Sequence, residues 1–125
     1  MSVRQSTEIL TIDAVRGAIG EMIPKGQTTL AQTAEAMGFS ARTLQRRLAE
    51  QGLNYSRLVD EVRFIKAREL IQERQKLSDV ATHLGYSDAG SFTRAFERWT
   101  GMSPLQYRKR FYQSVRMVKR YSHKK

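Results

Sequence analysis

An internal repeat sets the architecture of this chain. Residues 30–48 and residues 77–96 follow one plan, offset first by 47 positions and then, after a one-residue insertion, by 48. The positions matched before the insertion are Leu30, Ala34, Met37, Gly38, Phe39 and Ser40 with Leu77, Ala81, Leu84, Gly85, Tyr86 and Ser87. Those matched after it are Leu44, Arg46 and Leu48 with Phe92, Arg94 and Phe96. Each copy predicts a short helix, a tight glycine turn and a second helix with a polar outer face, which is the helix-turn-helix plan. Two copies in one small chain suggest a monomer that grips two grooves of DNA.

The composition indicates one globular, all-α domain. The 125 residues are 40% hydrophobic and 27% charged, enough to bury a modest core, and only two prolines interrupt the periodic segments. No apolar run approaches the length of a membrane span, and no signal-peptide pattern opens the chain. The absence of cysteine excludes disulfides and thiolate chemistry, which fits a reducing cytoplasm.

The net charge of +10 is concentrated near the C-terminus. Residues 1–97 carry 13 basic and 12 acidic side chains, whereas residues 98–125 carry nine basic and no acidic ones. Such a basic tail is compatible with binding DNA phosphates, and equally with a solvated, frayed chain end. A more telling local charge is the group Arg42, Arg46 and Arg47, because no acidic residue lies between Glu35 and Glu50.

Hydrophobic periodicity predicts about seven helices, in the approximate ranges 8–23, 29–37, 41–51, 55–73, 78–84, 87–100 and from 104 onward. The predicted N-caps are Thr29 (in a capping box with Gln32), Ser40, Asn54, Ser78, Ser87 and Ser103. The predicted core-facing residues are Ile9, Ile12, Val15, Ile19, Ile23, Leu30, Ala34, Met37, Leu44, Leu48, Tyr55, Leu58, Val62, Ile65 or Phe64, Leu70, Phe92, Phe96 and Trp99.

These elements predict a division of the chain into five segments. They are an N-terminal helix and connector that form part of the same domain (1–27), a first helix-turn-helix (28–53), a linker helix (54–76), a second helix-turn-helix with a closing helix (77–111) and a basic tail (112–125). Within the linker segment, the helix predicted at about 55–73 would span roughly 28 Å at about 1.5 Å per residue.

The second helix of the first copy has the side chains of a DNA reader. Because Leu44 and Leu48 face the core, the opposite face carries Arg42, Gln45 and Arg46, flanked by small alanines. Arginine can donate two hydrogen bonds to guanine, and glutamine can pair in bidentate fashion with adenine. On spacing alone, this face is also what an ordinary solvated helix presents.

The matching helix of the second copy has fewer long polar side chains on its outer face. Its outer face offers Asp88, Ala89, Gly90, Thr93, Arg94 and Glu97. Only Thr93 and Arg94 among them can read bases or bind phosphates. Ala89 could contact a thymine methyl group. We therefore expect the first unit to specify sequence and the second mainly to position the protein, so that replacing Arg94 weakens binding to cognate and random DNA alike.

Longer motifs in the same region resemble those of the AraC/XylS family of bacterial transcription regulators. The most specific stretch is Leu84-Gly85-Tyr86-Ser87, Ser91-Phe92-Thr93-Arg94-Ala95-Phe96, Trp99-Thr100-Gly101-Met102-Ser103-Pro104 and Tyr107-Arg108. Gly38-Phe39-Ser40 and Leu44-Gln45-Arg46 resemble the family's first helix-turn-helix, and Arg63, Ala67-Arg68 and Leu70-Ile71 resemble its linker helix. The resemblance covers about residues 28–110.

The resemblance implies two helix-turn-helix subdomains that read successive major grooves on one face of DNA. It implies base contacts from Arg42, Gln45, Arg46, Ala89, Gly90, Thr93 and Arg94, although members often carry longer polar side chains at positions 89 and 90. Candidates for phosphate contacts are Ser40, Thr43, Arg47, Ser87, Ser91 and Arg108. Two of the motif residues have structural alternatives: Tyr107 could pack on Phe96 or Trp99, and Arg108 could hydrogen-bond a helix end.

We therefore expect a sequence-specific regulator that binds a double-stranded DNA operator. It is either the DNA-binding domain of a longer protein, which we favour, or a freestanding monomeric regulator. The resemblance also implies contact with RNA polymerase, and any effector would bind a domain outside this chain. The alternatives are a sequence-nonspecific nucleic-acid binder driven by the basic tail, and an interaction module that contacts RNA polymerase. We expect neither enzyme activity nor a cofactor or metal, because His83 and His123 are too scattered for a cluster and no nucleophile–base pair stands out.

Overall fold

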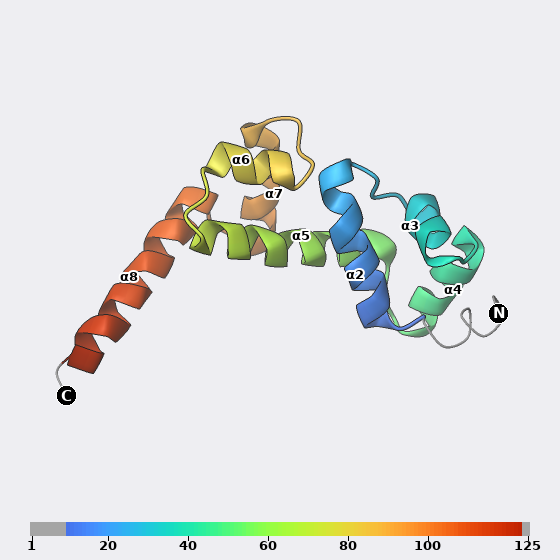
Figure 1. The fold of residues 1–125 in the computed structure, drawn as a ribbon, viewed down its shortest axis with the longest axis horizontal. Helices are drawn as coiled ribbons and strands as arrows, with labels where there is room; N and C mark the ends of the chain where they lie inside the picture. The colour runs from blue at the N-terminus through green and yellow to red at the C-terminus, as the bar shows by residue number, and fades with distance from the viewer. Residues whose placement is uncertain (1–9, 124–125) are drawn as a thin grey trace.

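The computed structural model describes residues 10–123, and the side chains of residues 10–116. Every regular element in this part of the chain is helical, as the sequence predicts (Figure 1). The elements are α2 (Ile12–Met22), the 3-10 helix η1 (Ile23–Lys25), α3 (Leu30–Met37), α4 (Ala41–Glu50), α5 (Tyr55–Gln72), α6 (Leu77–His83), α7 (Ala89–Thr100) and α8 (Pro104–His123).

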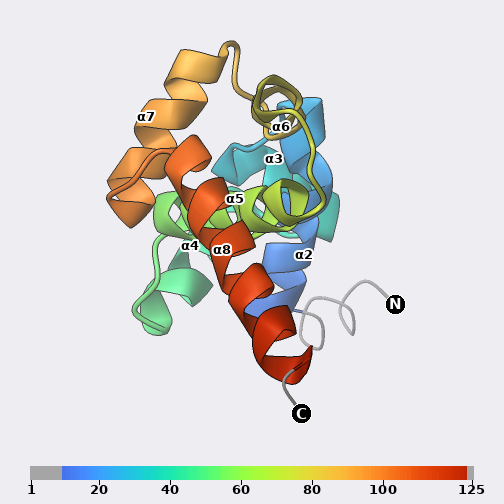
Figure 2. The same ribbon diagram turned by 90° about the vertical axis from the view of Figure 1, so that its left-hand side faces the viewer.

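The linker helix α5 joins two helix-turn-helix units, α3–α4 and α6–α7. In Figure 1, α2, α3 and α4 gather at its N-terminal end, and α6, α7 and α8 gather at its C-terminal end. Figure 2 shows α4 and α7 on one side of α5, with α2 on the other. The second helices of both units therefore lie on a common side of the molecule.

Local signals form the first unit as predicted. The Thr29 hydroxyl accepts from the Gln32 backbone N–H at 3.1 Å, and the side-chain amide oxygen of Gln32 accepts from the Thr29 backbone N–H at 3.3 Å. These reciprocal bonds satisfy two backbone donors that a helix start would leave unpaired. Gly38 ends α3 at a φ of 82°, a conformation that costs glycine little, and Ser40 caps α4.

The second unit departs from the predicted caps. Ser78 lies inside α6, which begins at Leu77 without a side-chain cap, and Asp88 rather than Ser87 caps α7. Asp88 accepts from the Ser91 backbone N–H at 2.7 Å. The inserted residue therefore lengthens the turn, and Asp88 takes the place that Ser40 has in the first unit.

The first helix starts later than predicted. It begins at Ile12 and is capped by Thr11, whose hydroxyl accepts from the Ala14 N–H at 3.1 Å. The predicted start at residue 8 and the predicted core residue Ile9 lie outside the described residues. The chain then turns through η1 to Gly26, which ends the segment as predicted.

The predicted stripe along the linker helix is partly wrong. Leu58 is buried as expected, and Tyr55, Val62, Phe64 and Leu70 pack against the core. Of the two alternatives Ile65 and Phe64, Phe64 therefore faces inward, whereas Ile65 is 37% exposed. Val59, Ala67 and Ile71 are buried although the predicted stripe omits them. The N-terminal part of α5 packs on α2 and its C-terminal part packs on α6, α7 and α8. Because its neighbours change along its length, the buried face of α5 changes too, and one straight stripe does not describe it.

The second unit is built on an aromatic cluster around Phe96, which is fully buried. Its ring lies 5.7 Å from that of Phe92, 6.0 Å from Phe64, 6.1 Å from Trp99 and 5.4 Å from Tyr107. The packing of Tyr107 on Phe96 confirms the structural alternative for that residue. The cluster also ties the closing helix to the linker helix.

The C-terminal helix is longer than the sequence suggested. α8 continues to His123, so residues 112–123 are helical rather than a frayed chain end. The Tyr112 hydroxyl donates to the Ile71 carbonyl at 3.2 Å, and the Arg74 guanidinium lies 4.5 Å from the centre of the Tyr112 ring. In Figure 2, α8 starts beside α7 and leads away toward the side on which α2 lies.

Candidate DNA interface

The outer face of α4 is exposed as the helical spacing predicts. Leu44 and Leu48 are 0% and 2% exposed, and both point into the core. Helical periodicity then turns Arg42, Gln45 and Arg46 outward, and all three are exposed. The side chains that the sequence selects as base readers are therefore free to meet a groove.

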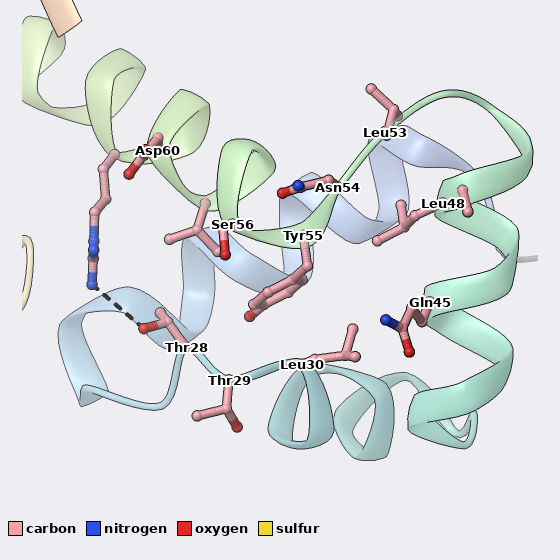
Figure 3. A pocket seen from close by; sticks show the side chains of 13 residues that line it. Thr28, Thr29, Leu30, Gln45, Leu48, Leu53, Asn54, Tyr55, Ser56 and Asp60 are labelled. Carbon is pink, nitrogen blue, oxygen red and sulfur yellow. Dashed lines mark hydrogen bonds between the residues drawn. The ribbon is translucent and has the colours of Figure 1, made fainter. Parts of the chain in front are cut away.

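The α4 face has two different edges. Gln45 and Ala49 line an open pocket of about 710 Å³ between α4 and the N-terminal ends of α3 and α5, whereas neither Arg42 nor Arg46 lines it. Figure 3 shows Gln45 on the flank of α4 that looks across this pocket toward Tyr55 and Leu30. A DNA strand on this face would thus meet two guanidinium groups on one edge and an amide beside the open pocket on the other.

Arg63 joins the two units across this hollow. It lines the pocket and donates to the Thr28 hydroxyl at 3.4 Å, while its guanidinium carbon lies 5.0 Å from the centre of the Tyr86 ring. Burial raises the pKa of the Tyr86 hydroxyl, and the nearby Arg63 cation opposes that rise. Arg63 therefore contacts both the connector before α3 and the turn before α7.

Gly85 lets the two units approach closely. Its φ is 87°, and an added Cβ would lie 3.0 Å from the backbone carbonyl oxygen of Ile23. The backbone of η1 cannot give way as a flexible side chain can. Glycine at this turn therefore permits the close approach of the second unit to η1 at the end of α2.

The candidate phosphate ligands lie in different settings. Ser40 and Thr43 are at the N-terminus of α4, where the Ser40 hydroxyl donates to that of Thr43 at 2.9 Å, and Arg47 is half-buried on the same helix. Ser91 is in the first turn of α7. The Arg108 guanidinium bonds the Gln75 carbonyl just after the linker helix ends, in line with its structural alternative.

The N-terminal turn of α7 holds a polar cluster that the sequence analysis missed. The Asp88 carboxylate accepts from the Ser91 N–H at 2.7 Å and from its hydroxyl at 3.3 Å, and Arg94 donates to the same hydroxyl at 3.3 Å. The backbone N–H of Ser91 holds the pKa of Asp88 below its usual range. The available signal was the spacing Asp88, Ser91, Arg94, which repeats every three residues and brings them to one helix face.

The other predicted residues of the second unit lie around this cluster. Ala89, Gly90 and Arg94 are exposed, and Thr93 is half-buried. Ser87 lies in the turn, where its hydroxyl donates to Asp88 at 3.4 Å.

Among the described residues, we find no group of side chains that could hold a metal ion. No helix in the same part of the chain is both long and apolar enough to cross a membrane.

Comparisons with known proteins agree with this architecture. A family model described as a helix-turn-helix domain matches residues 33–110. The chain is 40% identical over 97 residues to the HTH-type transcriptional regulator VirS of Mycobacterium tuberculosis, covering 77% of this chain and 28% of that protein. It is 36% identical over 96 residues to the regulator VqsM of Pseudomonas aeruginosa, covering 74% and 29%. This chain thus spans little more than a quarter of the length of these curated relatives.

Solved structures show the same fold. The transcriptional regulator CdpR from Pseudomonas aeruginosa matches with a TM-score of 0.66 and 37% identity, over 86% of this chain and 35% of that one. A DNA-binding transcriptional dual regulator from Escherichia coli K-12 matches with a TM-score of 0.67 and 29% identity, over 79% of this chain and 93% of that one.

Proposed function

Because the chain belongs to the AraC/XylS family of helix-turn-helix proteins, we propose that it binds double-stranded DNA at specific sequences and regulates transcription there. The observation that carries this proposal is the placement of α4 and α7 on a common side of the linker helix (Figure 2). One helix from each unit can then enter a major groove from the same side of the duplex.

The dimensions of the linker fit two neighbouring grooves. Successive major grooves on one face of DNA lie about 34 Å apart. The 18 residues of α5 span about 27 Å, and the width of the two units supplies the remainder. A rigid linker would require the DNA to bend or one helix to lift partly out of its groove.

Each unit would use its outer face in its own way. In the first, Arg42, Gln45 and Arg46 would read base edges, while Ser40, Thr43 and Arg47 would bind phosphates and orient α4. In the second, Thr93 and Arg94 would contact bases beside Ala89 and Gly90. Ser87 and Ser91 would lie near the backbone. Because Arg108 already bonds the end of the linker, it would act by holding α8 in place rather than on DNA.

The roles proposed for the whole protein follow from the greater length of its relatives. VirS and VqsM are regulators of which this chain matches 28% and 29%, so we propose that this module works within a longer bacterial, cytoplasmic regulator. Any effector would bind that protein's other domain. Contact with RNA polymerase is the partner role that activation of transcription would require.

Arg46→Ala is expected to weaken cognate binding by about 1–3 kcal/mol and to relax preference at one base position. The exposed guanidinium of Arg46 supplies the bidentate contact that would be lost. Binding isotherms on the cognate site and on single-base variants measure both effects. The matched control is Lys66→Ala, which removes one positive charge from the groove between α2 and α5. An unchanged base preference in Arg46→Ala would end its role as a reader.

A nonspecific mode driven by the basic C-terminus is the second candidate, favoured by the nine basic and no acidic residues in 98–125. Deleting residues 117–125 tests it and keeps Tyr112, which bonds the linker helix. Since α8 leads away from the side of α4 and α7 (Figure 2), we expect the truncated protein to keep its base preference and lose affinity mainly for random DNA. Filter binding on cognate and random DNA at several salt concentrations measures both. A truncated protein that loses affinity for cognate and random DNA to the same extent would favour the nonspecific mode.

A further inference from the structure

The two recognition helices differ at the positions that reach a groove first. Matched by their caps, Asp88 corresponds to Ser40, Gly90 to Arg42 and Arg94 to Arg46. The first unit thus has a neutral cap and two arginines one turn apart. The second has a charged cap and one arginine, and a glycine stands where the other arginine would be.

Backbone geometry does not explain the glycine at position 90. Gly90 lies in the first turn of α7 without a left-handed φ, so other residues could adopt its conformation. A glycine within a helix costs roughly 0.5–1 kcal/mol relative to alanine. The space beside it supplies the reason: a Cβ at position 90 would lie 3.2 Å from Asp88 Oδ1 and 3.4 Å from Arg94 Nη1.

That space is where the Arg94 side chain folds back toward the start of the helix. Its Nη2 donates to the Ser91 hydroxyl at 3.3 Å, and that hydroxyl donates to Asp88 Oδ2 at 3.3 Å. The N-terminal end of a helix disfavours a cation, and the Asp88 carboxylate offsets this effect. The guanidinium is thereby held beside the helix end whose residues contact base edges in helix-turn-helix complexes.

We propose that Gly90 and Asp88 position Arg94 as the reader of one base pair, and so set the sequence preference of the second unit. This inference rests on the proposed function. A guanidinium held in place loses less side-chain freedom on binding, and guanine, with its two acceptors, is the base that it matches. The sequence already makes Arg94 a candidate base contact, and the geometry adds Gly90 and Asp88 as the residues that position it. This inference predicts a loss of preference at one base position when Arg94 is replaced, in place of the even loss on cognate and random DNA expected from the sequence.

Three variants separate positioning from reading. Arg94→Ala removes the reader. Gly90→Ala adds a methyl group that would press on Asp88 Oδ1 at 3.2 Å and on Arg94 Nη1 at 3.4 Å, so that both must shift. Asp88→Ser keeps a capping hydroxyl, as Ser40 does in the first unit, but removes the carboxylate. The matched control is Gly17→Ala, the same change at an exposed position of α2, where a Cβ would meet nothing within 4 Å.

The experiment is selection of bound sites from a random duplex library with each full-length variant, together with its thermal unfolding. We expect Arg94→Ala, Gly90→Ala and Asp88→Ser to lose preference at the same base position of the second block, each by at least about five-fold, the lower end of what one bidentate contact supplies. Gly90→Ala and Gly17→Ala should both melt no lower than the wild type, because alanine favours helix. Preference in the first block should survive in all four variants.

Two results would overturn the inference while leaving the proposed function intact. If Arg94→Ala keeps the wild-type preference, Arg94 is not the reader. If Arg94→Ala loses this preference but Gly90→Ala and Asp88→Ser keep it, Arg94 reads the base without help from Gly90 and Asp88. A wild-type protein that enriches no sequence in either block would instead overturn both this inference and the proposed function.

Discussion

Phe96→Ala is expected to lower the free energy of unfolding by about 3–5 kcal/mol. The Phe96 side chain is fully buried, and its ring contacts four others, those of Phe64, Phe92, Trp99 and Tyr107. These four rings come from the linker helix, α7 and α8. Loss of the Phe96 ring therefore leaves a cavity where these three elements meet. Denaturant unfolding followed by circular dichroism measures the change.

The control for this variant is Phe111→Ala. Phe111 is half-buried, and its nearest aromatic neighbour is Tyr112, at 5.4 Å. We expect a clearly smaller loss of stability there. Equal losses at the two positions would show that the aromatic cluster around Phe96 does not hold the second unit together.

Leu48→Ala is expected to destabilise the protein by about 2–5 kcal/mol. Leu48 is 2% exposed and lies under the outer face of α4, so its truncation opens a cavity beneath the first recognition helix. Because the buried residues of both units form one cluster, we expect a single cooperative transition at lower denaturant concentration.

Leu105→Ala is the matched control for Leu48. Leu105 is 50% exposed on α8, so the same truncation removes little buried surface and should change stability by at most about 0.5 kcal/mol. A near-normal melting temperature for Leu48→Ala would contradict the assignment of the core face of α4, and with it the orientation of Arg42, Gln45 and Arg46.

The parts of the fold that depend on neighbouring residues could be predicted. The capping box at Thr29, the turn at Gly38 and the cap at Ser40 each involve groups within three or four residues of one another. The same holds for the exposed face of α4, because its two buried leucines fix the rotation of the helix. Local hydrogen-bonding capacity and a 3.6-residue period suffice for such features.

The features that were not predicted depend on which elements meet in space. The buried face of α5 changes because α2 covers one end and α6, α7 and α8 cover the other. Asp88 displaces Ser87 as a cap because the inserted residue falls in the turn, and the repeat alone places the insertion only somewhere between Ser40 and Leu44 of the first copy. Likewise, the bond from Arg108 to the Gln75 carbonyl joins residues 33 positions apart.

The candidate interface divides in the same way. Sequence periodicity selected the exposed residues of α4, but the pocket beside Gln45 arises from the N-terminal ends of two other helices. Gly90 and Ala89 looked uninformative because their side chains are small. The importance of Gly90 depends on two side chains that only the folded helix brings to it, namely Asp88 and Arg94.

Selection of bound sequences from a random duplex library at physiological salt tests the central claim most directly. With the wild-type protein, two-groove reading predicts a bipartite site, whose blocks lie about one helical turn apart, 10–10.5 base pairs centre to centre. The block read by α4 should be the stronger. Tight binding without any enriched sequence would contradict sequence-specific recognition by α4 and α7.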